Sequence, residues 1–161
     1  MYPRRNLIVF LWGLFVVTFG ASLIMAIQRS TGILKITNPY LYLIGPLSLL
    51  LGAAALLSTS LSIHEIAKSS NATKGLLLET LGAFCNGFAF WLVVMFVAFI
   101  IGLVEGPRFD MRALKMIASS GALMVYLYGW LRSSKFSWWG FVPCLAFLYL
   151  LVKSLLSFFL R

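Results

Sequence analysis

The chain has 161 residues, of which 61% are hydrophobic and only 11% are charged. Soluble domains of ordinary composition are about half apolar and about a quarter charged. A soluble fold of this length has too little interior to bury so much apolar surface, because a shell of its residues must face water. The composition therefore excludes an ordinary soluble domain and predicts an all-α, polytopic transmembrane helix bundle.

The formal net charge is +9, from 13 Lys and Arg residues against four acidic residues. Most of the basic residues lie in the gaps between apolar runs, where charges anchor helix ends and contact anionic lipid headgroups. A nucleic-acid partner would need a continuous basic face, and no polar gap is long enough to build one. The predicted partners are therefore membrane lipids, including anionic headgroups, and not nucleic acid.

Five apolar segments are predicted to span the membrane, since a spanning helix needs about 20 apolar residues. The runs are continuously apolar, whereas barrel strands alternate over about ten residues, so helices are predicted rather than strands. In chain order the segments are residues 7–27, 40–63, 76–104, 113–131 and 138–160. The fourth is short and holds Lys115 near its start, so four spans are the alternative. Residues 1–161 are predicted to form one transmembrane domain with no soluble domain.

The first segment, residues 7–27, is too long for the apolar core of a signal peptide, so we expect a retained span. Basic residues divide almost evenly between the two predicted sides of the membrane, and their count does not orient the chain. Arg4 and Arg5 flank the first segment, which favours a cytoplasmic N-terminus. The composition does not distinguish a plasma or inner membrane from an organelle membrane.

The second segment carries small residues at steps of three and four, which keep residues on one helix face. In lipid, small residues let helix backbones approach closely, and hydroxyls can hydrogen-bond across the contact. We therefore expect this face to pack against another helix, and a solute path along it is the alternative. No histidine or acid lies nearby in sequence to activate a serine as a nucleophile. The small-residue seam consists of Gly45, Ser48, Gly52, Ala55, Thr59 and Ser62.

Glu79 is an ionisable residue inside an apolar segment, which makes it a functional candidate by default. The simplest interpretation places its carboxylate at headgroup level, where it meets Lys68, Lys74 or Arg132. The alternative is a proton or cation site that Asn86 would help to form.

Asn86 is the most central strongly polar side chain of the third segment, and we expect it to form an interhelical hydrogen bond. Lys153 lies near the end of the last segment, where its long stem can reach the interface. Glu79 and Lys153 enter from opposite sides of the membrane, so a direct ion pair between them is not expected. Four residues at helical spacing are interpreted as packing, or as a groove for lipid, quinone or pigment: Phe84, Phe88, Trp91 and Met95.

The residues for catalysis are few. His64 is the single histidine and Asp110 the single aspartate, so neither a metal cluster nor an aspartyl dyad is expected within one chain. Cys85 and Cys144 both lie in apolar segments and are interpreted as small buried hydrophobic residues. The sequence therefore predicts no enzyme activity, no catalytic or metal site and no cofactor.

These observations favour a non-catalytic integral membrane protein, a structural or accessory subunit that packs against other membrane subunits or against copies of itself. The alternative is a small-solute or lipid transport component whose path is lined by Glu79, Asn86 and the face from Ser48 to Thr59. A lipid-modifying enzyme that uses Glu65, Glu79 or Asp110 is the least favoured of the three.

Overall fold

The computed structural model describes residues 2–31, 43–106, 110–132 and 138–160. Within them the chain forms five α-helices and one short 3-10 helix, and no strand. The prediction of an all-α helix bundle is confirmed. The elements are α1 (Tyr2–Ser30), α2 (Ile44–Ser69), α3 (Ala72–Glu105), α4 (Met111–Arg132), η3 (Trp138–Gly140) and α5 (Phe141–Phe159).

Four stretches of the described chain are long and apolar enough to cross a membrane: most of α1, all of α2, all of α3, and η3 with α5. The helix outside this set is α4, which corresponds to the short fourth segment. Lys115, Ser119 and Ser120 lower its hydropathy, although its 22 residues would reach about 33 Å. The bundle therefore combines four strongly apolar helices with one more polar helix.

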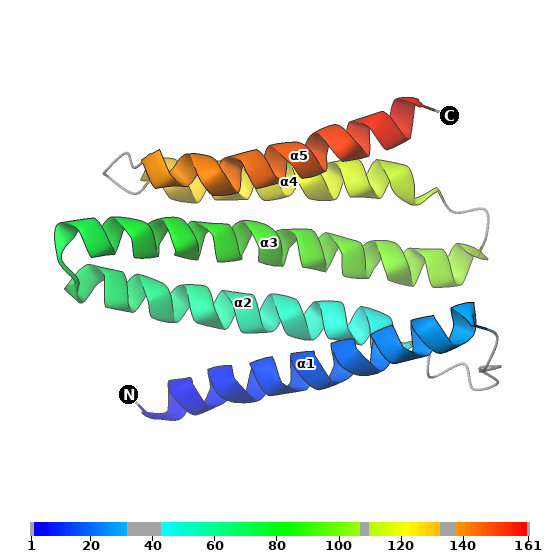
Figure 1. The fold of residues 1–161 in the computed structure, drawn as a ribbon, viewed down its shortest axis with the longest axis horizontal. Helices are drawn as coiled ribbons and strands as arrows, with labels where there is room; N and C mark the ends of the chain where they lie inside the picture. Colours follow the sequence, from blue (N-terminus) through cyan, green and yellow to red (C-terminus); the bar gives the residue numbers. More distant parts are fainter. Residues whose placement is uncertain (1, 32–42, 107–109, 133–137, 161) are drawn as a thin grey trace.

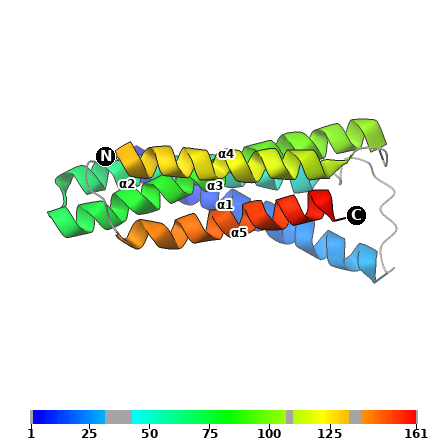
Figure 2. The same ribbon diagram turned by 90° about the horizontal axis from the view of Figure 1, so that it is seen from above.

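Consecutive helices run antiparallel and lie next to each other (Figure 1). The central helix, α3, packs against α2 and α4, while α1 packs against α2 and α5 against α4. Seen from above, α5 and the C-terminal end of α1 lie to the same side of α4 (Figure 2). Because the described residues form five α-helices, an odd number, the two ends of the chain lie at opposite ends of the bundle (Figure 1).

Helices α2 and α3 both extend beyond the apolar segments that predicted them. Residues 64–75 form the polar gap between the second and third predicted spans, yet α2 continues to Ser69 and α3 begins at Ala72, so only Ser70 and Asn71 separate the two helices. The close turn has a steric reason, because a Cβ on the buried Gly75 would lie only 3.1 Å from the Ala67 carbonyl oxygen. Hydropathy locates apolar sequence and not helix ends, so both helices carry polar ends that lie beyond the predicted spans.

The 34 residues of α3 make a helix about 51 Å long, which exceeds a hydrocarbon core of about 30 Å. Its C-terminus is closed by Gly106, whose φ of 70° favours glycine. At the last segment, residues 138–140 form η3 before α5 begins at Phe141. The first three residues of the predicted second segment, 40–42, lie outside the described residues.

The interior is small and lies along α3. One core cluster joins α3, α4 and α5, and a smaller one joins α2 to α3. Outside these clusters large apolar side chains are exposed on every α-helix, for example Val17, Leu61, Val104, Met124 and Leu145. Such a surface suits hydrocarbon rather than water, because water disfavours extended apolar patches.

Candidate functional site

The small-residue seam lies on the inner side of α2. Ser48, Gly52 and Ala55 are buried, and the other three seam residues are partly buried. The leucines on the remaining faces of α2 stand apart from them, since Leu57 and Leu61 are 45% and 70% exposed. The face of α2 that carries small residues is thus the face turned toward other helices.

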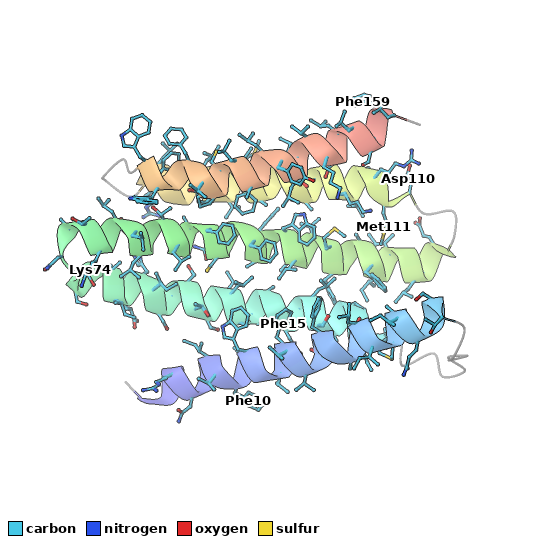
Figure 3. The ribbon with its side chains drawn as sticks, viewed as in Figure 1. Phe10, Phe15, Lys74, Asp110, Met111 and Phe159 are labelled. Atoms are coloured by element: carbon cyan, nitrogen blue, oxygen red, sulfur yellow. The ribbon has the colours of Figure 1, made fainter. Side chains whose placement is uncertain are left out.

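Three seam residues, each seven positions apart, meet α1. A Cβ on Gly45 would lie 3.4 Å from the Ser22 hydroxyl. A Cβ on Gly52 would lie 2.9 Å from the ring of Phe15, which points from α1 toward α2 (Figure 3). Thr59 accepts a hydrogen bond of 2.9 Å from the indole N–H of Trp12. Glycine at position 52 therefore leaves the space that the Phe15 ring fills.

Most hydroxyls of the helices donate to carbonyls of their own helix. Ser48 donates to the Gly45 carbonyl at 2.6 Å, and Thr59 donates to the Ala55 carbonyl at 2.7 Å. Ser58 and Thr80 do the same. A hydroxyl bonded in this way is satisfied at low cost in an apolar environment. These groups therefore carry no free polarity that would attract a solute.

The sequence analysis missed a second small-residue face on α2, which packs against α3. Ala53, Ser60 and Ala67 are all buried there, and Ser60 donates a hydrogen bond of 3.0 Å to the Gly82 carbonyl of α3. The three residues are seven positions apart, so their spacing was a usable signal. The repeat beginning at Gly45 is the stronger signal, because it is longer and holds more glycine.

Helices α3, α4 and α5 meet at Gly87. A Cβ on Gly87 would lie 2.9 Å from both the Ala122 carbonyl oxygen of α4 and the Phe147 ring of α5. Near the start of α5 the fully buried Tyr126 donates a hydrogen bond of 2.5 Å to the Gly140 carbonyl. The sequence predicts no role for Tyr126, because its partner lies 14 positions away.

A second polar contact joins α4 to α5 near their other ends. The hydroxyls of Ser119 and Ser154 lie 3.0 Å apart, and Ser119 is almost completely buried. Each hydroxyl also lies 2.8 Å from a carbonyl oxygen of its own helix, Ser119 from that of Lys115 and Ser154 from that of Leu150, so one serine donates across the contact while the other donates to its own helix. Hydroxyls thus bridge α4 and α5 as they do α1 and α2.

The three residues of the predicted polar intramembrane site do not come together. Glu79 and Asn86 are half-buried on α3, whereas Lys153 is exposed on α5. Because α3 and α5 run in the same direction (Figure 1), Glu79 in the first third of α3 and Lys153 in the last third of α5 lie near opposite ends of the bundle. Among the described residues no ion pair joins them. Of the three residues, only Glu79 and Asn86 lie on one face of the same helix.

The aromatic residues of α3 pack against both core clusters. The rings of Phe84 and Phe88 are nearly parallel with centroids 6.1 Å apart, and Phe88 and Trp91 stack at 5.7 Å. Phe84 also lies 5.5 Å from the Phe147 ring of α5. Phe88 and Trp91 contact both clusters, and so they connect the two halves of the interior. This arrangement favours the packing interpretation of these residues.

The arrangement as a whole is suited to holding helices together in lipid. Each pair of neighbouring helices meets at small residues, at an interhelical hydrogen bond, or at both. Among the described residues, no three His, Cys, Asp or Glu side chains lie together where they could hold a metal ion. No family model, curated protein or solved structure matches the chain, so its function must be inferred from the residues themselves.

Proposed function

We propose that the chain is a non-catalytic integral membrane protein, a structural or accessory subunit that packs against other membrane subunits or copies of itself. One observation carries the proposal. Large apolar side chains cover the outside of the bundle, while small residues and self-satisfied hydroxyls fill its helix contacts. A protein built in this way has a surface for lipid and for other transmembrane helices.

The scarcity of reactive groups in the sequence supports the non-catalytic part of the proposal. Redox, hydrolytic and metal enzymes need clusters of histidine, cysteine and acids, and this chain has one histidine, two cysteines and four acids. The transport alternative needs a polar path through the bundle. The hydroxyls of Ser48 and Thr59 donate to their own helix, which leaves the α2 side of such a path with little free polarity.

The basic residues near the bundle ends support contact with anionic lipid headgroups. Lys68 and Lys74 are exposed beside the turn between α2 and α3, and Arg132 is exposed at the end of α4. Each such charge contributes about 1 kcal/mol of attraction near an anionic membrane surface. We place this end and the N-terminus in the cytoplasm, because Arg4 and Arg5 flank the first helix.

Expression in membranes, followed by purification in mild detergent, tests the proposal. We expect the chain to stay in the membrane pellet through an alkaline carbonate wash and to purify as an oligomer, either with itself or with other membrane subunits in a fixed ratio. A chain that carbonate releases would contradict membrane integration. A purified monomer that moves a solute into liposomes, and loses this flux on Glu79→Gln, would replace the accessory role with the transport alternative.

A further inference from the structure

Glu79 and Asn86 share one open strip of α3. They are seven residues apart, as are Asn86 and Val93, so all three lie on the same side of the helix. The flanking residues show which side this is: Gly82 faces α2, and Phe90 faces α4. The polar strip, which consists of Glu79, Asn86 and Val93, therefore runs along α3 between its contacts with α2 and α4, the two α-helices that α3 mainly packs against in the described chain.

The polar groups of this strip lack partners among the described residues. Glu79 and Asn86 are half-buried, and among the described residues neither side chain has a hydrogen-bond or ion-pair partner. Asn86 lies near the middle of α3, at a depth where the hydrocarbon offers it no partner. An amide in that position favours a contact that supplies both a donor and an acceptor.

Arg132 provides a matching charge on the same side of the bundle. A Cβ on Gly129 of α4 would lie 3.0 Å from Ala83 of α3, and the two helices are antiparallel, so Arg132 and Glu79 lie at nearly the same depth. Arg132 also continues, at helical spacing, the face of α4 that holds Gly121, whose Cβ would meet Phe90 beside the polar strip. Arg132 is exposed, and among the described residues of one chain it forms no ion pair with Glu79.

We propose that the polar strip of α3 and the neighbouring face of α4 bind a second copy of this chain in the membrane, related to the first by a two-fold axis along the membrane normal. Two copies with the same orientation keep every residue at its own depth. Asn86 then meets Asn86 of the second copy, and an amide complements another amide because each has donors and an acceptor. The two Glu79 carboxylates then lie near each other across the axis, and Arg132 of each copy lies beside Glu79 of the other, so two arginines offset the repulsion between two acids.

This inference rests on the membrane-protein proposal above. It selects a second copy of the chain, and not another membrane subunit, as the packing partner. The first test is disulfide crosslinking of Asn86→Cys in native membranes, in a chain whose Cys85 and Cys144 are replaced by alanine. A disulfide forms only if the two Cα atoms come within about 7 Å, so Asn86→Cys should yield a covalent dimer. Leu145→Cys is the matched control: it is 64% exposed on α5, and its neighbour Phe147 meets Gly87 at the depth of Asn86. It should remain monomeric.

The second test separates pairing between copies from effects inside one copy. Glu79→Arg alone and Arg132→Glu alone each place like charges opposite one another, so each chain by itself should lose dimerisation in liposomes, measured by energy transfer between labelled copies. A mixture of the two variants should dimerise again, because the altered residues are then complementary across the contact. Asn86→Leu should weaken the wild-type dimer about threefold, the effect of one average interhelical hydrogen bond.

The outcomes distinguish this inference from the proposal on which it rests. Release of the wild-type chain from membranes by carbonate would refute membrane integration itself. If the chain is retained but Asn86→Cys stays monomeric, crosslinks no better than Leu145→Cys, or links only to proteins of other mass, the dimer alone is refuted. Failure of the mixed charge variants to restore energy transfer, with both retained in membranes, also refutes it.

Discussion

At the scale of single residues, the bundle depends on positions where no side chain fits. A Cβ added to Gly52 of α2 would lie 2.9 Å from the ring of Phe15 of α1 and 3.2 Å from the side chain of Leu92 of α3. By contrast, Gly13 of α1 has nothing within 4 Å of its hypothetical Cβ. Glycine is therefore required at some positions and incidental at others. The sequence pattern marks both as small and does not distinguish them.

Gly52→Leu should destabilise the bundle by about 1–3 kcal/mol, the usual cost of forcing a large side chain into a packed contact. Leu51→Phe is the control at the adjacent position, where the side chain is only partly buried and lies on another face of α2. We expect Leu51→Phe to be tolerated. Unfolding of both variants by SDS in mixed micelles measures the difference, and equal losses of stability would contradict a packing role for the small-residue seam.

At the scale of elements, hydropathy predicts which segments become helices but not which faces of them pair. The five predicted segments correspond to five α-helices, because long apolar runs have few alternatives in lipid. The partner of Trp12, the Thr59 hydroxyl, is 47 positions away, and local spacing carries no information about it. The hydrogen bond from Ser60 to the Gly82 carbonyl could not be predicted from local spacing either, because the two residues are 22 positions apart. Glu79 and Asn86 were recognised from sequence because an unusual residue type in an apolar run is visible without its neighbours.

The more polar helix, α4, should depend on its neighbours to enter the membrane. Ser119, Tyr126 and Trp130 are buried against α3 or α5, and α4 falls outside the strongly apolar set. A translocon insertion assay with α4 alone should give little insertion, whereas α3–α4–α5 together should place α4 across the membrane. The segment of η3 with α5 is the control and should insert alone. Efficient insertion of isolated α4 would contradict the prediction that α4 needs α3 and α5 in order to enter the membrane.

At the scale of the whole molecule, an odd number of antiparallel helices sets the positions of the two chain ends. The N-terminus lies at one end of the bundle and the C-terminus at the other (Figure 1). If all five helices cross, the two termini face different compartments. If only the four strongly apolar segments cross, the termini face the same compartment.

Paired reporter fusions decide between these topologies. We expect an N-terminal fusion to be active only with a reporter that works in the cytoplasm, and a C-terminal fusion only with one that works on the other side. A fusion after Ser70, in the turn between α2 and α3, should behave as the N-terminal fusion does. Cytoplasmic signals from both termini would mean that α4 does not cross.

The order of the helices in space has a consequence for how the chain is made. Each of α2 to α5 packs against the helix that precedes it in sequence. A ribosome releases the chain from its N-terminus, so α2 meets α1, and then α3 meets α2, while later segments are still being synthesised. Assembly during translation therefore follows the order of synthesis, and contacts that are close in sequence favour rapid folding.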